Sequence, residues 1–252
     1  MEEKNLMETQ IKHNNKVYRV DLSSPIDISI PLRASKDNVT AWYVDAPVIE
    51  PVKMGDWIGD VNKGGSVNFR NIFFNPHGHG THTECVGHIS KENYSINNCL
   101  KFFWFFAQLV TIEPEKSGND NVITKNKIPF INSGVEALVI RTLLNDDSKI
   151  SRHYSNTNPP YLHHEAAAMI RDTDINHLLL DLPSVDKEKD EGKMLAHKAF
   201  WNYPDKTREN ATITELIYVP DTIPDGLYFL NIQIASFEND ASPSKPVLYA
   251  LK

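Results

Sequence analysis

"FFNPHGHGTHTECVGHIS", residues 73–90, contains four of the ten histidines of this chain. They are His77, His79, His82 and His88, and the acid Glu84 lies among them. Imidazole and carboxylate groups are the ligands that Zn²⁺ and similar ions take in proteins. The stretch therefore favours a metal site over the simpler alternative, a histidine-rich strand or loop whose rings make only structural hydrogen bonds.

The spacing within this stretch indicates which side chains meet. In an extended segment the side chains alternate between two faces, so His82, Glu84 and His88 point to one side. His77 and His79 have the other parity. The glycines on either side of residue 79 could form a bulge, which would turn one of these two histidines into the cluster. The sequence leaves open which of the two it is.

Two other patterns in the stretch predict different chemistry. The string HGTH, residues 79–82, also surrounds the catalytic histidine of subtilisin-like proteases. Those enzymes need an Asp-Ser/Thr-Gly segment and a Gly-Thr-Ser-Met-Ala segment, and this sequence has neither. Cys85 could serve as a nucleophile between two histidines. On an extended strand it faces away from both, so a buried structural cysteine is the better interpretation.

Composition limits the class of protein. The chain has 252 residues, of which 40% are hydrophobic and 23% charged, as in ordinary globular proteins. The net charge of −7 argues against nucleic acid or an anionic membrane as the main partner. Two cysteines are too few for a disulfide scaffold, and the longest apolar run, residues 102–110, is too short to span a bilayer. The polar N-terminus lacks an apolar signal region, so we expect a cytoplasmic protein.

The order of predicted elements favours one α/β domain over residues 13–252, after a flexible tail at 1–12. No linker separates two compositions. Helices are predicted at 162–172 and 192–200, where strong helix formers follow each other. An irregular excursion is predicted at 44–70. Apolar or alternating runs predict strands at 16–23, 26–32, 67–75, 101–113, 135–144, 177–182, 216–220 and 226–235.

The histidine stretch resembles the hallmark of the cyclase family, which includes bacterial kynurenine formamidase and isatin hydrolase. That hallmark is His-x-Gly-Thr-His-x-Asp-x-Pro-x-His. Here Gly80, Thr81, His82 and His88 match it in register. Glu84 stands in place of the aspartate, Val86 in place of the proline, and Gly78 in place of the first histidine.

The resemblance continues in order along about the whole chain. DLSSPI (21–26) resembles the opening strand of the family, and ALVIRTLL (137–144) resembles its Ile-Arg-Thr segment. LHHEAAAMI (162–170) and LLLDLPSVD (178–186) resemble the helix and the Asp-x-x-Ser-x-Asp strand that follows it. His197 with Glu209 resembles the late histidine–glutamate pair, and SPSKP (242–246) the closing segment.

The resemblance implies a role for each matching residue. His82 and Glu84 would bind metal, as would the late pair His197 and Glu209. His88 would act beside the metal as general acid and base. His77, or His79 in its place, would replace the missing first histidine.

The implied fold is a swivelling β/β/α domain with a mixed, barrel-like β core and a few helices. The implied cofactor is Zn²⁺ or Mn²⁺, as one or two ions. The implied function is hydrolysis of a carbon–nitrogen bond, in an amide or formamide, by a metal-activated water. A lactone or cyclic ester hydrolase or a dehydratase using the same site, or an inactive binding relative, remains an alternative. The expected partners are a small-molecule substrate and a second copy of the chain, in a homodimer or homotetramer.

Overall fold

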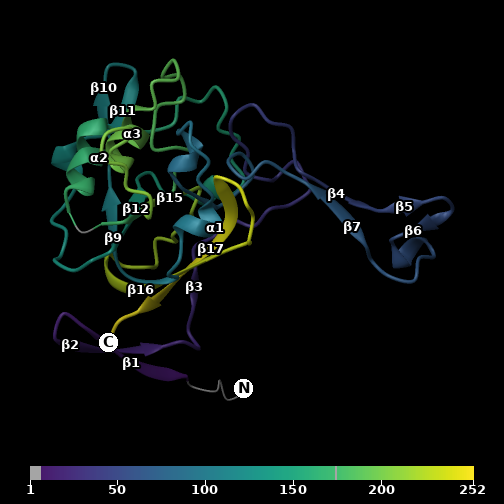
Figure 1. Ribbon diagram of the computed structural model, residues 1–252, viewed down its shortest axis with the longest axis horizontal. Helices are drawn as coiled ribbons and strands as arrows, with labels where there is room; N and C mark the ends of the chain where they lie inside the picture. Colours follow the sequence, from purple (N-terminus) through teal and green to yellow (C-terminus); the bar gives the residue numbers. More distant parts are fainter. Residues whose placement is uncertain (1–6, 174) are drawn as a thin grey trace.

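The computed structural model describes residues 7–173 and 175–252, and a closed β-barrel forms its centre (Figure 1). The barrel strands follow the order β16-β9-β12-β14-β15-β8-β17, and β17 pairs back with β16. Strands β9, β12, β14 and β15 run parallel, and the other neighbours are antiparallel. The bounds are β8 (His82–Glu84), β9 (Trp104–Ile112), β12 (Ala137–Thr142), β14 (His177–Leu180), β15 (Thr212–Glu215), β16 (Gly226–Ile234) and β17 (Ala241–Ala250).

The parallel strands are apolar on both faces, because successive side chains of a strand point to opposite sides. Val139 and Leu179 pack in one buried cluster with Leu109, on the inner face of the barrel. Leu138 and Leu178 belong to a second cluster, on the outer face, which contains the buried sides of two helices. This double burial explains why these strands appear in the sequence as continuous apolar runs.

Two helices cover the outer face of the barrel. They are α2 (His164–Arg171) and α3 (Leu195–Trp201), and Phe200 and Trp201 of α3 are fully buried against it. Shorter turns are α1 (Ile96–Cys99), η1 (Val61–Lys63), η2 (Val86–His88), η3 (Lys125–Lys127) and η4 (Asp147–Ile150). Within the described part of the chain, every helix is too short to cross a bilayer.

A narrow arm projects from the barrel (Figure 1). It consists of two antiparallel pairs, β4 (Val48–Pro51) with β7 (Arg70–Phe73), and β5 (Lys53–Met54) with β6 (Trp57–Ile58). The sequence predicted an irregular excursion at 44–70; the segment contains these short strands, joined by turns and irregular backbone. The chain leaves the arm at Phe73 and enters the histidine stretch directly, so the base of the arm lies beside the candidate site.

The N-terminal segment differs from the predicted flexible tail. Residues 8–12 belong to strand β1 (Glu8–His13), which pairs with β2 (Lys16–Asp21), while residues 1–6 lie outside the described part. Outside the barrel, β3 (Ile26–Asp27) pairs with β17, and a small sheet contains β10 (Glu115–Ser117), β11 (Asp120–Ile123) and β13 (Tyr161–Leu162).

The predicted fold class is confirmed: the chain is a mixed α/β structure with a barrel-like core and few helices. Two strand predictions were misplaced. The strand predicted at 216–220 lies earlier, at β15, and the strand predicted at 26–32 is reduced to β3. After Phe73, the histidine stretch forms a strand only at β8 and then continues into the turn η2, because backbone pairing with β15 and β17 stops at Glu84.

Candidate metal centre

Two neighbouring strands bring the central acids and one histidine together. His82 of β8 lies directly opposite Glu215 of β15, and residues opposite each other on paired strands share a face. Glu84, two residues after His82, points to that same face by strand alternation. This is the outer face beneath α3, and the His82, Glu84 and Glu215 side chains are at most 4% exposed. The atom His82 Nε2 lies 3.5 Å from Glu215 Oε2.

Helix α3 adds His197 to this cluster from above. The Nε2 atom of His197 lies 3.1 Å from Glu84 Oε1 and 3.8 Å from Glu215 Oε1. Its Nδ1 atom lies 2.6 Å from Asp186 Oδ2. The Asp186 carboxylate also accepts the backbone N–H groups of Ala196 and His197, at 2.7 and 3.1 Å. Asp186 therefore caps the helix and holds the ring of His197 with the same group.

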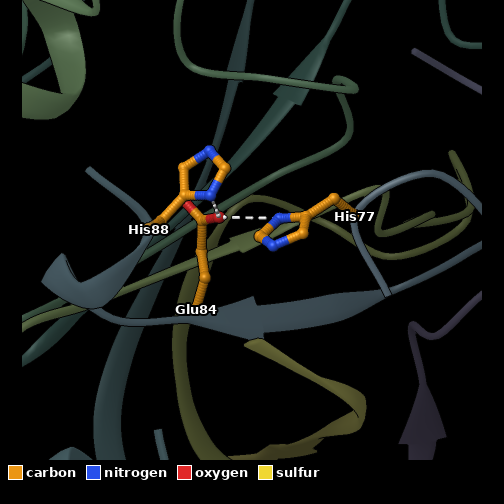
Figure 2. A group of neighbouring side chains, drawn as sticks. All are labelled: His77, Glu84 and His88. Atoms are coloured by element: carbon orange, nitrogen blue, oxygen red, sulfur yellow. Dashed lines mark ion pairs between the residues drawn. The ribbon is translucent and has the colours of Figure 1, made fainter. Parts of the chain in front are cut away.

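The loop before β8 brings in His77 and keeps His79 apart. His77 Nδ1 lies 3.1 Å from Glu84 Oε2, as Figure 2 shows. His79 is buried elsewhere: its Nδ1 accepts the N–H of Asn75, and its Nε2 donates to the carbonyl of Asp45 at 2.6 Å. Gly78 explains the altered motif, because a Cβ there would lie 2.7 Å from Val44 Cγ2. The loop has no room for a histidine at position 78.

Three of the histidines share one arrangement. His77, His82 and His197 each place one ring nitrogen on an outer group, and the other nitrogen faces Glu84 or Glu215. The outer groups are the Asp240 carboxylate at 2.9 Å, the Gly80 carbonyl at 3.0 Å and the Asp186 carboxylate at 2.6 Å. Metal-binding histidines in proteins are held in this way, because the outer bond fixes the tautomer and the orientation of the ring.

Two buried atoms at the centre have no hydrogen bond within residues 7–173 and 175–252. They are His82 Nε2 and Glu84 Oε2. An unsatisfied buried nitrogen or carboxylate oxygen is costly, and a cation between them would satisfy both. Two overlapping triads have ligand atoms close enough to share an ion, namely His77, Glu84 and His88, and His82, Glu84 and Glu215. The donor set fits a divalent metal, and Glu84 belongs to both triads.

The electrostatics of the cluster depend on pairing between acids and imidazoles. Burial opposes a charge on His77 and on His197, yet their neighbouring carboxylates outweigh it and raise both pKa values to about 10. Burial also favours the neutral form of Glu84, but the nearby rings, His88 foremost, hold its pKa well below the ordinary range. The carboxylates that raise the pKa values of these rings would also attract a metal cation, and its binding requires the ligating rings to be neutral.

His88 lies at the edge of the cluster. Its Nδ1 atom is 3.9 Å from Glu84 Oε2 and 3.3 Å from Asp240 Oδ2, and its side chain is 28% exposed. In Figure 2 its other ring nitrogen points away from Glu84. A cavity of about 580 Å³ opens beside His77 and His88, and Trp42, Val44 and Met194 supply apolar parts of its wall.

Among the predicted site residues, the structure leaves Glu209 outside the cluster. Its side chain is exposed and accepts a hydrogen bond from Tyr94 Oη at 3.3 Å. The acid that lies beside His197 is Glu215. The sequence interpretation missed it because it placed the strand at 216–220 rather than 212–215. Asp240 was also missed, since it stands alone in a polar loop and carries no pattern in the sequence.

Comparison with known proteins identifies the family of this chain. Residues 20–187 match the model of the family described as "Putative cyclase". The chain belongs to the cyclase family. Kynurenine formamidase of Bacillus thuringiensis is 25% identical over 228 residues, which cover 88% of this chain and 96% of that protein. Kynurenine formamidase of a Bacillus cereus strain is 24% identical over 225 residues, with the same coverage. The predicted resemblance is confirmed.

Solved structures share the fold of this cyclase-family chain. A potential metal-dependent hydrolase with cyclase activity has a TM-score of 0.64 at 17% identity, covering 90% of this chain and 97% of that one. An isatin hydrolase bound to the product analogue thioisatinate has a TM-score of 0.63 at 13% identity, covering 91% and 93%. The prediction of a hydrolase of this family agrees with these relatives.

Proposed function

We propose that this protein is a metal-dependent hydrolase that cleaves the carbon–nitrogen bond of an amide or formamide. The observation that carries the proposal is the buried cluster in which three oriented histidines face Glu84 and Glu215, beside an open cavity. A relative supports the reaction class, because its name, kynurenine formamidase, describes an enzyme that acts on a formamide. We propose Zn²⁺ or Mn²⁺ as the ion.

The residues that would hold the metal are His77, His82, Glu84, His197 and Glu215. A divalent cation bound there supplies Lewis acidity, which polarises a carbonyl group and makes water more acidic. Glu84 belongs to both triads of possible ligand atoms, so its carboxylate would be the acid common to the site. Asp186 and the Gly80 carbonyl keep His197 and His82 turned toward this position.

His88 is suited to move the proton. It lies at the boundary between the cluster and the cavity, where a substrate amide has to enter. A base there can take a proton from the attacking water and return it to the leaving nitrogen. General acid–base catalysis of this kind contributes about 10²–10⁴-fold. The apolar wall formed by Trp42, Val44 and Met194 would accommodate the apolar part of an aromatic or aliphatic substrate.

The first experiment is to measure the metal content per chain of protein purified without a metal-affinity tag. The protein loaded with Zn²⁺ or Mn²⁺ is then assayed against N-formyl arylamines and against lactones. We expect bound metal and turnover of the formamides. Turnover of lactones alone would support the cyclic ester alternative, and bound metal without any turnover would support an inactive binding relative.

Replacement of His88 by alanine tests its role. We expect His88→Ala to keep its metal and to lose about 10²–10⁴-fold in kcat. His153→Ala is a matched control, because that histidine is exposed and bonds only the Lys36 carbonyl among the described residues. Full activity of His88→Ala would remove it from the mechanism.

We also propose that the protein forms a homodimer or homotetramer through its arm. The pair β4–β7 carries exposed apolar side chains, among them Val48, Ile72 and Phe73. Two-stranded sheets are marginally stable in water unless another surface covers them. Light scattering should give a mass of at least two chains, and Ile72→Lys should lower it. A single-chain mass for the unaltered protein would contradict the proposal.

A further inference from the structure

One loop residue contacts both His77, a candidate ligand, and His88, the candidate base. Asp240 precedes β17, and its Oδ2 atom lies 2.9 Å from His77 Nε2 and 3.3 Å from His88 Nδ1. One carboxylate oxygen has two lone pairs and can accept a hydrogen bond from each ring. The two rings lie next to each other, with centroids 4.3 Å apart and planes inclined by 30°. Asp240 therefore connects the two histidines through a single atom.

The position of Asp240 is fixed by its main chain. Its carbonyl accepts the N–H of Cys85, the residue after Glu84, at 3.0 Å. Gly87, in the turn η2 that carries His88, makes the close approach possible. A Cβ at position 87 would lie 3.2 Å from the Cβ of Asp240 and 2.4 Å from the Tyr94 carbonyl oxygen. The loop and the turn are thus packed closely enough to hold the carboxylate against the His88 ring.

The geometry has a consequence for the state of His88. A neutral imidazole carries its proton on one nitrogen, and the hydrogen bond at the other atom decides which one it is. When Nδ1–H donates to Asp240, the lone pair is on Nε2, the nitrogen that points away from Glu84 in Figure 2. With Nδ1 bonded to Asp240, the Nε2 lone pair of His88 is available for acid–base chemistry, and Nδ1 is not available as a metal ligand.

We propose that Asp240 is a positioning residue, which holds His88 with its proton on Nδ1 and its basic Nε2 toward the substrate cavity, and which orients His77 through the same oxygen. The role in turnover rests on the function proposed above. The orientation of the ring does not rest on it, and it can be measured without a substrate.

The test compares Asp240→Ala and Asp240→Asn with Glu238→Gln. Glu238 is a matched control because it lies in the same loop and bonds Asn97 and Asn98 instead, at 2.7 and 3.5 Å. The ring nitrogens of His88 are followed by ¹⁵N NMR in zinc-loaded protein, at about pH 8, where an ordinary imidazole is neutral. Loss of the signals in His88→Gln assigns them.

We expect the Nδ1–H form in the unaltered protein and in Glu238→Gln. In both Asp240 variants we expect the Nε2–H form, which free histidine prefers. An Nε2–H ring in the unaltered protein, or an unchanged tautomer in both Asp240 variants, would overturn the proposal. Because this readout needs no turnover, it decides the question even if no formamide is hydrolysed.

Metal binding and kinetics separate positioning from ligation. Loss of an orienting carboxylate weakens metal affinity by about 10–100-fold, so both Asp240 variants should still fill with zinc at saturation. At saturating metal we expect kcat on an N-formyl arylamine to fall by about 10²-fold or more, with KM nearly unchanged. If both variants bind no zinc at any concentration while remaining folded, Asp240 is a ligand and the proposal is wrong.

Discussion

The paired substitutions Glu215→Gln and Glu209→Gln test which late acid belongs to the metal centre. Both make the same chemical change, from a carboxylate to an amide of equal size. Glu215 is buried, with Oε1 3.8 Å from His197 and Oε2 3.5 Å from His82. Its Oε1 also accepts the Val185 N–H at 2.9 Å, a bond that a glutamine oxygen can still make. The fold should therefore survive while the charge is lost.

The magnitude follows from the burial of the charge. Removing one partner of a buried, paired charge costs about 3–5 kcal/mol. At about 1.4 kcal/mol for each factor of ten, Glu215→Gln should weaken Zn²⁺ binding by about 10²-fold to 4 × 10³-fold. Glu209 is exposed and bonds only Tyr94 among the described residues, so Glu209→Gln should change the affinity less than twofold.

The assay is competition for Zn²⁺ with a chromophoric chelator, with circular dichroism of the metal-free proteins as the control for folding. The reasoning is refuted if Glu209→Gln loses the metal and Glu215→Gln keeps it. Such a result would restore the assignment that the family resemblance implied. It would also mean that the position of β15 does not decide which acid reaches the ion.

Three further predictions follow from individual contacts and from the electrostatics of the cluster. Asp186→Asn should weaken metal binding about 10–100-fold, because it frees the His197 ring, and lower the free energy of unfolding by about 1 kcal/mol, because it frees the start of α3. Competition for metal and urea titration measure the two effects. Equal losses in the control Asp190→Asn would contradict this prediction. Gly78→Ala should lower the free energy of unfolding in urea by about 1–3 kcal/mol, since its Cβ would lie 2.7 Å from Val44 Cγ2. An unchanged unfolding midpoint would show that the loop shifts to accommodate the methyl group. The pKa values of His77 and His197 are raised to about 10 in the folded protein, so the unfolded rings release their protons first as the pH rises. The metal-free protein should therefore lose stability between about pH 6.5 and pH 10. The midpoint of thermal unfolding should fall across this range.

The sequence alone predicted the family, the fold class and most residues of the candidate centre. The spacing of His82 and Glu84 follows from strand alternation, which is local and can be read from residue numbers. The α/β class follows from the apolar runs that became β9, β12 and β14. These features depend on periodicity along the chain, so no knowledge of distant contacts is needed to predict them.

Tertiary structure alone decided between alternatives that lie close together in the sequence. His77 reaches Glu84 and His79 does not, because the loop packs Gly78 against Val44. Glu215 enters the cluster because the register of β15 places it opposite His82, whereas Glu209 precedes the strand and stays in solvent. Asp240 reaches His77 and His88 across more than 150 residues. Strand register and loop packing depend on contacts between distant segments, and no local pattern encodes them.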